Sequence, residues 1–239
     1  MRWADSGRMG LYFVEMGADP RPIQVLYDRA GSAMAAATAD MFDWPSVCQS
    51  RVFHVSGITQ GLSVTSAKLV RTALDEAKHR GCLTSFDVNY RQMLWPVSAA
   101  AAALETVAPM IDVLICTAED ARDLFGMTGE GLTVATALQV RLGVRTVVVT
   151  MGSRGALALQ DGSACERGGY QVAVIDRIGA GDAFAAGLLW GLLEGSLEAG
   201  LERGLAMSAL KMTIRGDLFR FNRSDVELLL GRSQREVPR

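Results

Sequence analysis

From residue 51 onward the chain alternates short apolar runs of strand length with longer amphipathic runs of helix length. A strand followed by a helix and a further strand is the pattern of parallel βαβ units, in which helices cover a parallel sheet. The sequence therefore predicts an α/β fold with a doubly wound, mostly parallel sheet flanked by helices. The expected strands and helices occupy, in order, residues 51–56, 65–80, 83–87, 98–107, 113–116 and 118–125.

The second half of the chain continues this alternation and ends in helices. The strand expected at residues 146–150 is rich in valine, which suits a position that is buried on both faces of a sheet. Ser224 followed by Glu227 is expected to form the capping box of a short last helix. The other elements expected here are a helix at residues 134–142, strands at 146–150 and 156–159, and helices at 181–193 and 198–214.

The composition is that of an ordinary globular protein, with 49% hydrophobic residues and a formal charge of −2. This balance argues against nucleic acid or an anionic membrane surface as a partner, because both favour basic patches. The longest apolar run is far too short to span a membrane, and the first residues lack a hydrophobic signal region. Cys48, Cys82, Cys116 and Cys165 are scattered without a C-x-x-C pair, which indicates reduced thiols, no metal site and a cytoplasmic location.

The strongest local motif is Asp176-Arg-Ile-Gly179-Ala180-Gly181-Asp182, which precedes an apolar helix. The first amides of a helix point outward and its dipole is positive there, so this turn could bind a phosphate group. The carboxylate of Asp182 beside it could accept the proton of an attacking hydroxyl. The alternative is that Asp182 only caps the helix and the glycines only permit a tight turn.

Other catalytic motifs are absent from the sequence. There is no Gly-Lys dipeptide and hence no Walker A loop, and the third glycine of a dinucleotide-binding motif would fall at Phe184. His54 and His79 have no recognisable serine or cysteine partner, so they are expected to be structural and a hydrolase is not supported.

The Asp-x-x-Gly-Ala-Gly-Asp loop resembles the signature of the ribokinase/PfkB family of carbohydrate kinases, and the resemblance runs from about residue 10 to 217. It implies a ribokinase-like fold and the use of ATP with Mg²⁺. It also implies that Asp182 is the catalytic base, that the amides of Gly179, Ala180 and Gly181 form the anion hole, and that Asp176 lies beside a monovalent cation.

Further segments are similar to 2-keto-3-deoxygluconate kinases, notably the Gly-Leu-Tyr-Phe run at residue 10 and Asp-Val-Asn-Tyr-Arg at residue 87. Residues 11–15 and 24–27 read as a hairpin, and the resemblance makes residues 10–30 a substrate-side lid beside a core of residues 51–230, within a single domain. Arginine forks and hydroxyls suit a sugar carboxylate. The resemblance implies that the sugar contacts are Tyr12, Tyr27, Arg29, Asn89 and Arg91. Taken singly, each of these five residues could instead be an ordinary strand, surface or turn residue.

Two more segments resemble the nucleotide side of the family. Gly152 and Gly155 follow the valine-rich strand where the family approaches the ATP phosphates, although a plain hairpin turn is the alternative. Thr117, Glu119 and Asp120 stand where the family usually has Asn-x-x-Glu. The resemblance makes Thr117 a nucleotide contact and the two carboxylates supports for a hydrated Mg²⁺.

The chain departs from the family at its front, because the first strand and a Gly-Gly sugar-binding segment have no counterpart before residue 10. We therefore expect a sequence that lacks the family's N-terminal segment, through either a true truncation or a wrongly chosen start. The sheet edge exposed by this loss would favour a homo-oligomer. The expected activity is ATP-dependent phosphorylation of 2-keto-3-deoxygluconate. The alternatives are a kinase of the fructokinase or ribokinase type and a nucleotide-binding fragment with impaired catalysis.

Overall fold

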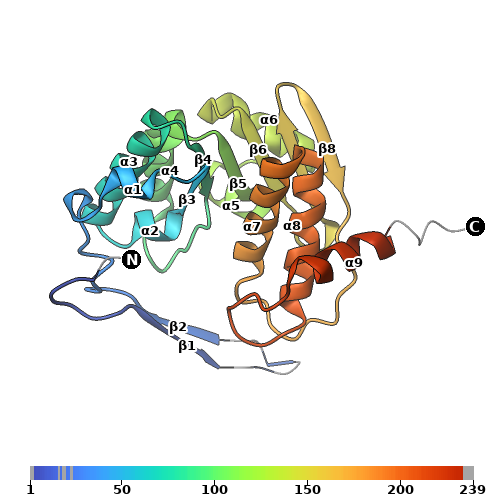
Figure 1. Ribbon diagram of the computed structural model, residues 1–239, viewed down its shortest axis with the longest axis horizontal. Coiled ribbons are helices and arrows are strands. Elements are labelled where there is room, and N and C mark those ends of the chain that lie inside the picture. The colour runs from blue at the N-terminus through green and yellow to red at the C-terminus, as the bar shows by residue number, and fades with distance from the viewer. Residues whose placement is uncertain (1–2, 16, 18–19, 22–23, 234–239) are drawn as a thin grey trace, which may run out of the picture. The chain divides into compact units, whose positions relative to one another are not determined.

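The computed structural model describes residues 3–15, 17, 20–21 and 24–233. The chain divides into two compact units, Met1–Met110 and Ile111–Arg239, and Figure 1 labels the larger helices and many of the strands.

The first unit contains an antiparallel hairpin of β1 (Leu11–Glu15) and β2 (Gln24–Asp28). This confirms the predicted hairpin, with the second strand one residue longer than expected. Tyr12 pairs directly with Tyr27 across the two strands. Part of the turn-rich stretch between the strands, at residues 16, 18–19 and 22–23, lies outside the described residues.

The first unit also contains a βαβ arrangement, in which β3 (Val52–Ser56) pairs in parallel with β4 (Leu83–Asp87). The intervening α3 (Val64–His79) begins where Ser63 accepts a hydrogen bond from the Ser66 amide, which satisfies one of the free N–H groups of the first turn. Buried apolar residues of α3 and β4, such as Leu74 and Phe86, form the core of the first unit. The remaining elements are η1 (Ala39–Met41), α1 (Trp44–Val47), α2 (Gly57–Gly61), α4 (Val97–Val107) and η2 (Ala108–Met110).

The second unit is built on four strands. β5 (Val113–Thr117) runs parallel to β6 (Thr146–Thr150), and β7 (Ala156–Gln160) and β8 (Ser163–Arg167) follow as antiparallel strands. The three valines of β6 are fully buried, as predicted for a strand covered on both faces. Helix α6 (Gly131–Leu142) packs on β6 and β7. Helix α5 (Ala118–Phe125) follows β5, and the short helix η3 (Gly152–Arg154) lies between β6 and β7.

Helices α7 (Ala180–Glu194) and α8 (Leu197–Met212) lie side by side in the second unit (Figure 1). Their backbones approach closely because glycines face each other at the contact. A Cβ atom added at Gly191 would lie 2.4 Å from the Cα of Gly200, and one at Gly187 would lie 2.6 Å from the carbonyl oxygen of Arg203. Glycine is therefore required for this helix pair to close.

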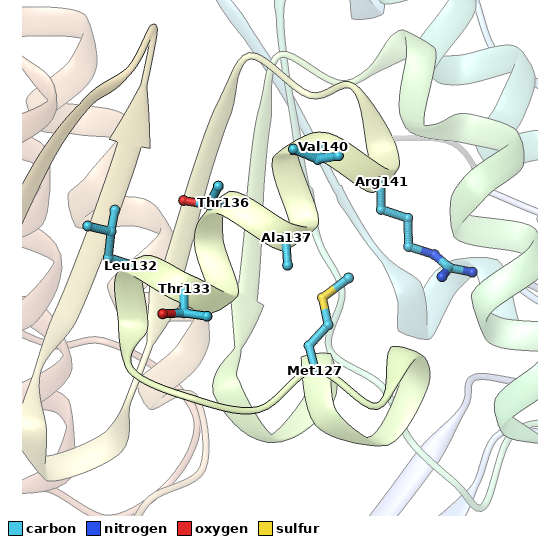
Figure 2. Close-up of a pocket in the computed structure, with 7 residues that line it drawn as sticks. All are labelled: Met127, Leu132, Thr133, Thr136, Ala137, Val140 and Arg141. Carbon is cyan, nitrogen blue, oxygen red and sulfur yellow. The ribbon is translucent and has the colours of Figure 1, made fainter.

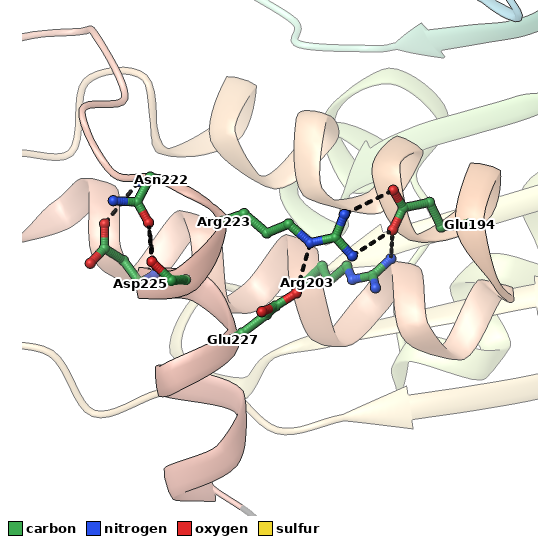
Figure 3. A network of polar contacts seen from close by, with 7 residues as sticks. Glu194, Arg203, Asn222, Arg223, Asp225 and Glu227 are labelled. Atoms are coloured by element: carbon green, nitrogen blue, oxygen red, sulfur yellow. Dashed lines mark hydrogen bonds and ion pairs between the residues drawn. The ribbon is translucent and has the colours of Figure 1, made fainter.

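The last helix, α9 (Arg223–Ser233), starts with a different cap from the predicted one. The Asp225 amide donates to Asn222 Oδ1 at 3.2 Å, and the Asn222 amide donates to Asp225 Oδ2 at 2.8 Å. The Ser224–Glu227 box is therefore wrong, because asparagine and aspartate take the two reciprocal positions. Glu227 instead pairs with Arg223, which also reaches Glu194 of α7 (Figure 3).

Two negative findings apply to the part of the chain that the structure describes. None of its helices is long and apolar enough to cross a membrane. All four cysteines are free thiols; burial and the neighbouring Cys82 raise the pKa of Cys48 above its usual value.

Candidate active site

The loop that enters α7 is held in a conformation that needs glycine. Gly179 has φ +79° and is the N-cap of α7, and a Cβ atom there would lie 2.5 Å from the carbonyl oxygen of Asp217. The turn containing Asp217 thus packs directly against the start of α7. At Gly181, by contrast, a Cβ atom would meet nothing within 4 Å, so this side of the loop is open.

The first turn of α7 presents unsatisfied donors beside a carboxylate. The Ala180 amide donates to Arg177 O at 3.1 Å, whereas within the described chain the amides of Gly181 and Asp182 donate to no backbone carbonyl. The Asp182 side chain is exposed and has no hydrogen-bond or ion-pair partner among the described residues. It is therefore not the helix cap, which is Gly179. The loop thus places a helix start of the kind that can bind an anion beside a carboxylate without a partner among the described residues.

Asp176 has the opposite environment and is 3% exposed. Its Oδ1 accepts from the Ile178 amide at 3.0 Å and its Oδ2 from the Gly216 amide at 2.9 Å. These bonds join the entry of the loop to the turn that follows α8.

The family resemblance implies a monovalent cation beside Asp176. Lys211 of α8 is fully buried, and its Nζ donates to Ile214 O at 3.4 Å, in the turn that binds Asp176. Ile214 O, a carbonyl oxygen of this turn, thus already faces an ammonium group. The donor set does not fit an added cation at Ile214.

The predicted nucleotide-side glycines lie on the tight connection between β6 and β7. Gly155 has φ +105°, and a Cβ atom there would lie 1.9 Å from Arg167 O, so backbone packing alone requires glycine. Gly152 has φ +61° and open space where its Cβ atom would be. A hollow of about 410 Å³ lies beside this connection, lined by residues that include Arg167, Gly168 and Tyr170.

Thr117, Glu119 and Asp120 lie at the start of α5, directly after β5. Thr117 is the N-cap, and its Oγ1 accepts from the Asp120 amide at 2.8 Å. Asp120 is buried, whereas Glu119 is exposed and pairs with Arg122 at 3.4 Å. The described residues contain no group of three or more His, Cys, Asp or Glu side chains suited to holding a metal ion.

Three of the predicted sugar contacts gather on the hairpin of the first unit. The Tyr12 and Tyr27 rings lie 6.3 Å apart, and the Arg29 guanidinium lies 4.2 Å from the centre of the Tyr27 ring. Arg8, which the sequence analysis did not identify, fixes this strand end: it pairs with the Asp28 carboxylate and donates to Ala30 O at 2.8 Å. No motif marks Arg8, because its partners are mainly backbone carbonyls.

Asn89 and Arg91 lie on a separate loop, after β4. Asn89 has φ +40°, a left-handed conformation that is uncommon outside glycine and that asparagine tolerates better than most residues. The Arg91 guanidinium is exposed and donates to Tyr90 O at 2.9 Å. Both remain predicted sugar contacts.

A larger hollow of about 620 Å³ lies on the outer face of α6 and contains none of the predicted site residues (Figure 2). Val140 at its rim is 81% exposed. Its lining is mostly apolar and has no carboxylate, so it offers no chemistry for group transfer.

The family model and the relatives described here show that the protein is a phosphotransferase. Residues 1–221 match the model of the pfkB family carbohydrate kinases, and the chain belongs to this family. It is 38% identical over 231 residues to a 2-dehydro-3-deoxygalactonokinase of Haloferax volcanii, an alignment that covers 96% of this chain and 73% of that protein. It is 35% identical to a 2-dehydro-3-deoxygluconokinase of Thermoproteus tenax, over 74% of this chain and 53% of that protein.

Solved structures show the same ribokinase-like α/β fold. The crystal structure of 2-dehydro-3-deoxygluconokinase from Thermotoga maritima is 33% identical, with a TM-score of 0.86, over 94% of this chain and 74% of that one. A putative Ribokinase II from E. coli, solved in complex with ATP and Mg²⁺, is 23% identical with a TM-score of 0.81, over 93% of this chain and 71% of that one.

Proposed function

We propose that the protein phosphorylates a 2-keto-3-deoxy sugar acid, 2-keto-3-deoxygluconate, at the expense of ATP. The observation that carries the proposal is the exposed, unpartnered carboxylate of Asp182 beside the free amides of the first turn of α7. The names of the relatives support the substrate class, and so do the clustered hydroxyls and guanidinium of Tyr12, Tyr27 and Arg29.

In this reaction Asp182 accepts the proton of the terminal hydroxyl group of the sugar acid while that oxygen attacks the γ-phosphorus of ATP. The bond from the γ-phosphorus to the bridging oxygen breaks, and ADP leaves with that electron pair. The amides of Gly181 and Asp182 stabilise the charge on the transferring phosphoryl group. The products are 2-keto-3-deoxy-6-phosphogluconate and ADP.

Mg²⁺ would neutralise charge on the nucleotide phosphates, which usually supply several of its ligands together with water. Asp120 is the residue of this chain that would support it, with Glu119 as a second carboxylate. Gly152, whose surroundings are open, and Thr117 would contact the nucleotide.

A second candidate is the C4 epimer, 2-keto-3-deoxygalactonate, because the Haloferax volcanii relative carries that name. Both epimers have the same carboxylate and terminal hydroxyl, so the residues named above serve either one. A hydroxyl difference in a polar site changes the specificity constant more than a change in apolar size does.

The test is coupled ADP release with both sugar acids, fructose and ribose at matched concentrations. We expect turnover with one or both sugar acids and little with the neutral sugars. A preference for fructose or ribose would contradict the substrate class and favour a fructokinase or ribokinase. Binding of ATP without turnover of any of the four sugars would favour a nucleotide-binding protein.

A further inference from the structure

Lys211 is a buried lysine whose surroundings resemble those of a bound cation. It lies in the last turn of α8 and is fully buried, and its Nζ donates to a backbone carbonyl, Ile214 O, at 3.4 Å. An ammonium group in a protein interior is stable only when oxygen atoms replace its water shell. Ile214 O, two residues beyond the end of α8, is one such oxygen, and the carbonyl groups of the last helical turn carry partial negative charge that favours a cation there.

The turn that holds Lys211 is joined to the anion-binding loop by a continuous set of contacts. The amides of Ile175 and Asp176 donate to Met212 O at 2.8 and 3.2 Å. The Gly216 amide donates to the Asp176 carboxylate at 2.9 Å. Asp217 O then abuts Gly179, the N-cap of α7.

We propose that the ammonium group of Lys211 is a built-in cation that takes the place of a bound monovalent metal ion in organising this loop. This proposal rests on the proposed function for its catalytic consequence, but its structural part does not. The ammonium binds Ile214 O in the turn at residues 213–217, and the same turn binds the buried carboxylate of Asp176 through the Gly216 amide. Lys211 is thus a positioning residue: it holds the turn against Gly179 and so fixes the amides beside Asp182.

A bound K⁺ and a lysine ammonium differ in one way that can be tested. The ion leaves when it is replaced by a cation too large for the site, whereas the lysine remains. The wild-type protein is therefore expected to be indifferent to the identity of the monovalent cation. A variant without the ammonium is expected to become dependent on a small cation.

The experiment compares the full-length wild type, Lys211→Met and Lys68→Met in equal concentrations of KCl and tetramethylammonium chloride. Lys68 is an exposed lysine of α3, so its variant controls for loss of one charge. We expect the turnover of the wild type and Lys68→Met to agree within about twofold between the salts. Lys211→Met should lose about tenfold or more in tetramethylammonium and recover in part in KCl, in line with the loss of a hydrogen bond from a charged group.

Thermal unfolding in the same two salts gives a readout that does not depend on catalysis. KCl should raise the melting temperature of Lys211→Met relative to tetramethylammonium and leave that of the wild type unchanged. If no sugar acid is turned over, the proposed function fails, and the melting temperatures still decide the role of Lys211.

Two results would overturn the proposal. The first is wild-type turnover or stability that depends strongly on K⁺, which requires no variant and holds even if Lys211→Met does not fold. The second is a folded Lys211→Met variant that loses stability equally in both salts, which would make Lys211 a simple helix cap.

Discussion

Asp176 and Asp182 stand at the two ends of one loop and have opposite environments. Asp176 is buried and both its oxygens accept backbone N–H groups, so it holds the loop together. Asp182 is exposed and unpartnered among the described residues, so its carboxylate is free to interact with a substrate. The same side chain thus has a structural role at Asp176, and at Asp182 it is available for the chemistry that we propose.

The role of Asp182 is tested by Asp182→Asn, which keeps the shape of the side chain and removes the proton acceptor. We expect turnover to fall by roughly a hundred- to ten-thousand-fold, because that is the usual contribution of a general base. ATP affinity measured by calorimetry should change little. Asp161→Asn is the matched control: Asp161 is an exposed aspartate that pairs with Arg145 away from the loop. A fall in turnover of less than about threefold in Asp182→Asn would exclude a general-base role.

Arg29 is predicted to bind the carboxylate of the sugar acid. Its guanidinium is stacked on Tyr27, which fixes its position without using its hydrogen-bond donors. Arg29→Met keeps much of the stacking volume and removes the charge. We expect KM for the sugar acid to rise by about tenfold to a hundredfold, as for the loss of a charge-assisted hydrogen bond, with KM for ATP unchanged. Arg71→Met, at an exposed position of α3, is the control. Equal increases in both KM values would assign Arg29 to the fold instead.

At the scale of elements, the position of the loop before α7 depends on the close packing of α7 against α8. Gly187 and Gly191 on α7 face Arg203 and Gly200 on α8 without side chains between the backbones. Because the loop precedes α7 and the Lys211 turn follows α8, this packing fixes the distance between the two. The salt bridges of Glu194 with Arg203 and Arg223 add α9 to the same assembly (Figure 3).

Gly191→Ala tests this packing. The new methyl group would meet Gly200 at 2.4 Å, so the helices must separate, and we expect a loss of about 1–3 kcal/mol or more in the free energy of unfolding. Gly231→Ala is the control: it also replaces a helical glycine, but a Cβ atom there meets nothing within 4 Å. That change should be neutral or slightly stabilising, because alanine favours helix. Denaturant unfolding of both variants measures the difference. Similar stability of the two variants would contradict the close packing.

The sequence predicts elements well where a single local signal decides them. Residues 83–87 and 118–125 are confirmed as β4 and α5 to the residue, because apolar runs and helix signals end sharply there. Helix α6 starts at Gly131 rather than residue 134, because Gly131 is buried against Met151 and tertiary packing outweighs its low helix propensity. The short helices α1 and α2 have too few residues to show a period.

The candidate site was predictable in part for the same reason. The loop from Asp176 to Asp182 is contiguous, so its glycines and carboxylates are visible as a motif. Lys211 stands in the sequence as one lysine in an apolar helix, and only the packing of α8 against its neighbours shows that its side chain is buried. Arg8 is likewise revealed only by the fold, because its contacts are with residues of a distant strand end.

At the scale of the whole molecule, the predicted ligand contacts divide between the two units. The five predicted sugar contacts lie in Met1–Met110, and the anion-binding loop and nucleotide-side residues lie in Ile111–Arg239. We therefore expect the sugar acid to reduce backbone motion first in Met1–Met110, and the nucleotide to reduce it first in Ile111–Arg239.

Hydrogen exchange measured by mass spectrometry tests this division. A non-hydrolysable ATP analogue should slow amide exchange at residues 177–183, because the amides of Gly181 and Asp182 would gain a phosphate acceptor. The sugar acid added alone should slow exchange in β1, β2 and the Asn89 loop, where the clustered Tyr12, Tyr27 and Arg29 side chains would be ordered. Fructose is the control ligand and should leave that region unchanged. Protection by the sugar acid confined to Ile111–Arg239 would contradict the assignment of the hairpin to the sugar, even if the protein proves to be an active kinase.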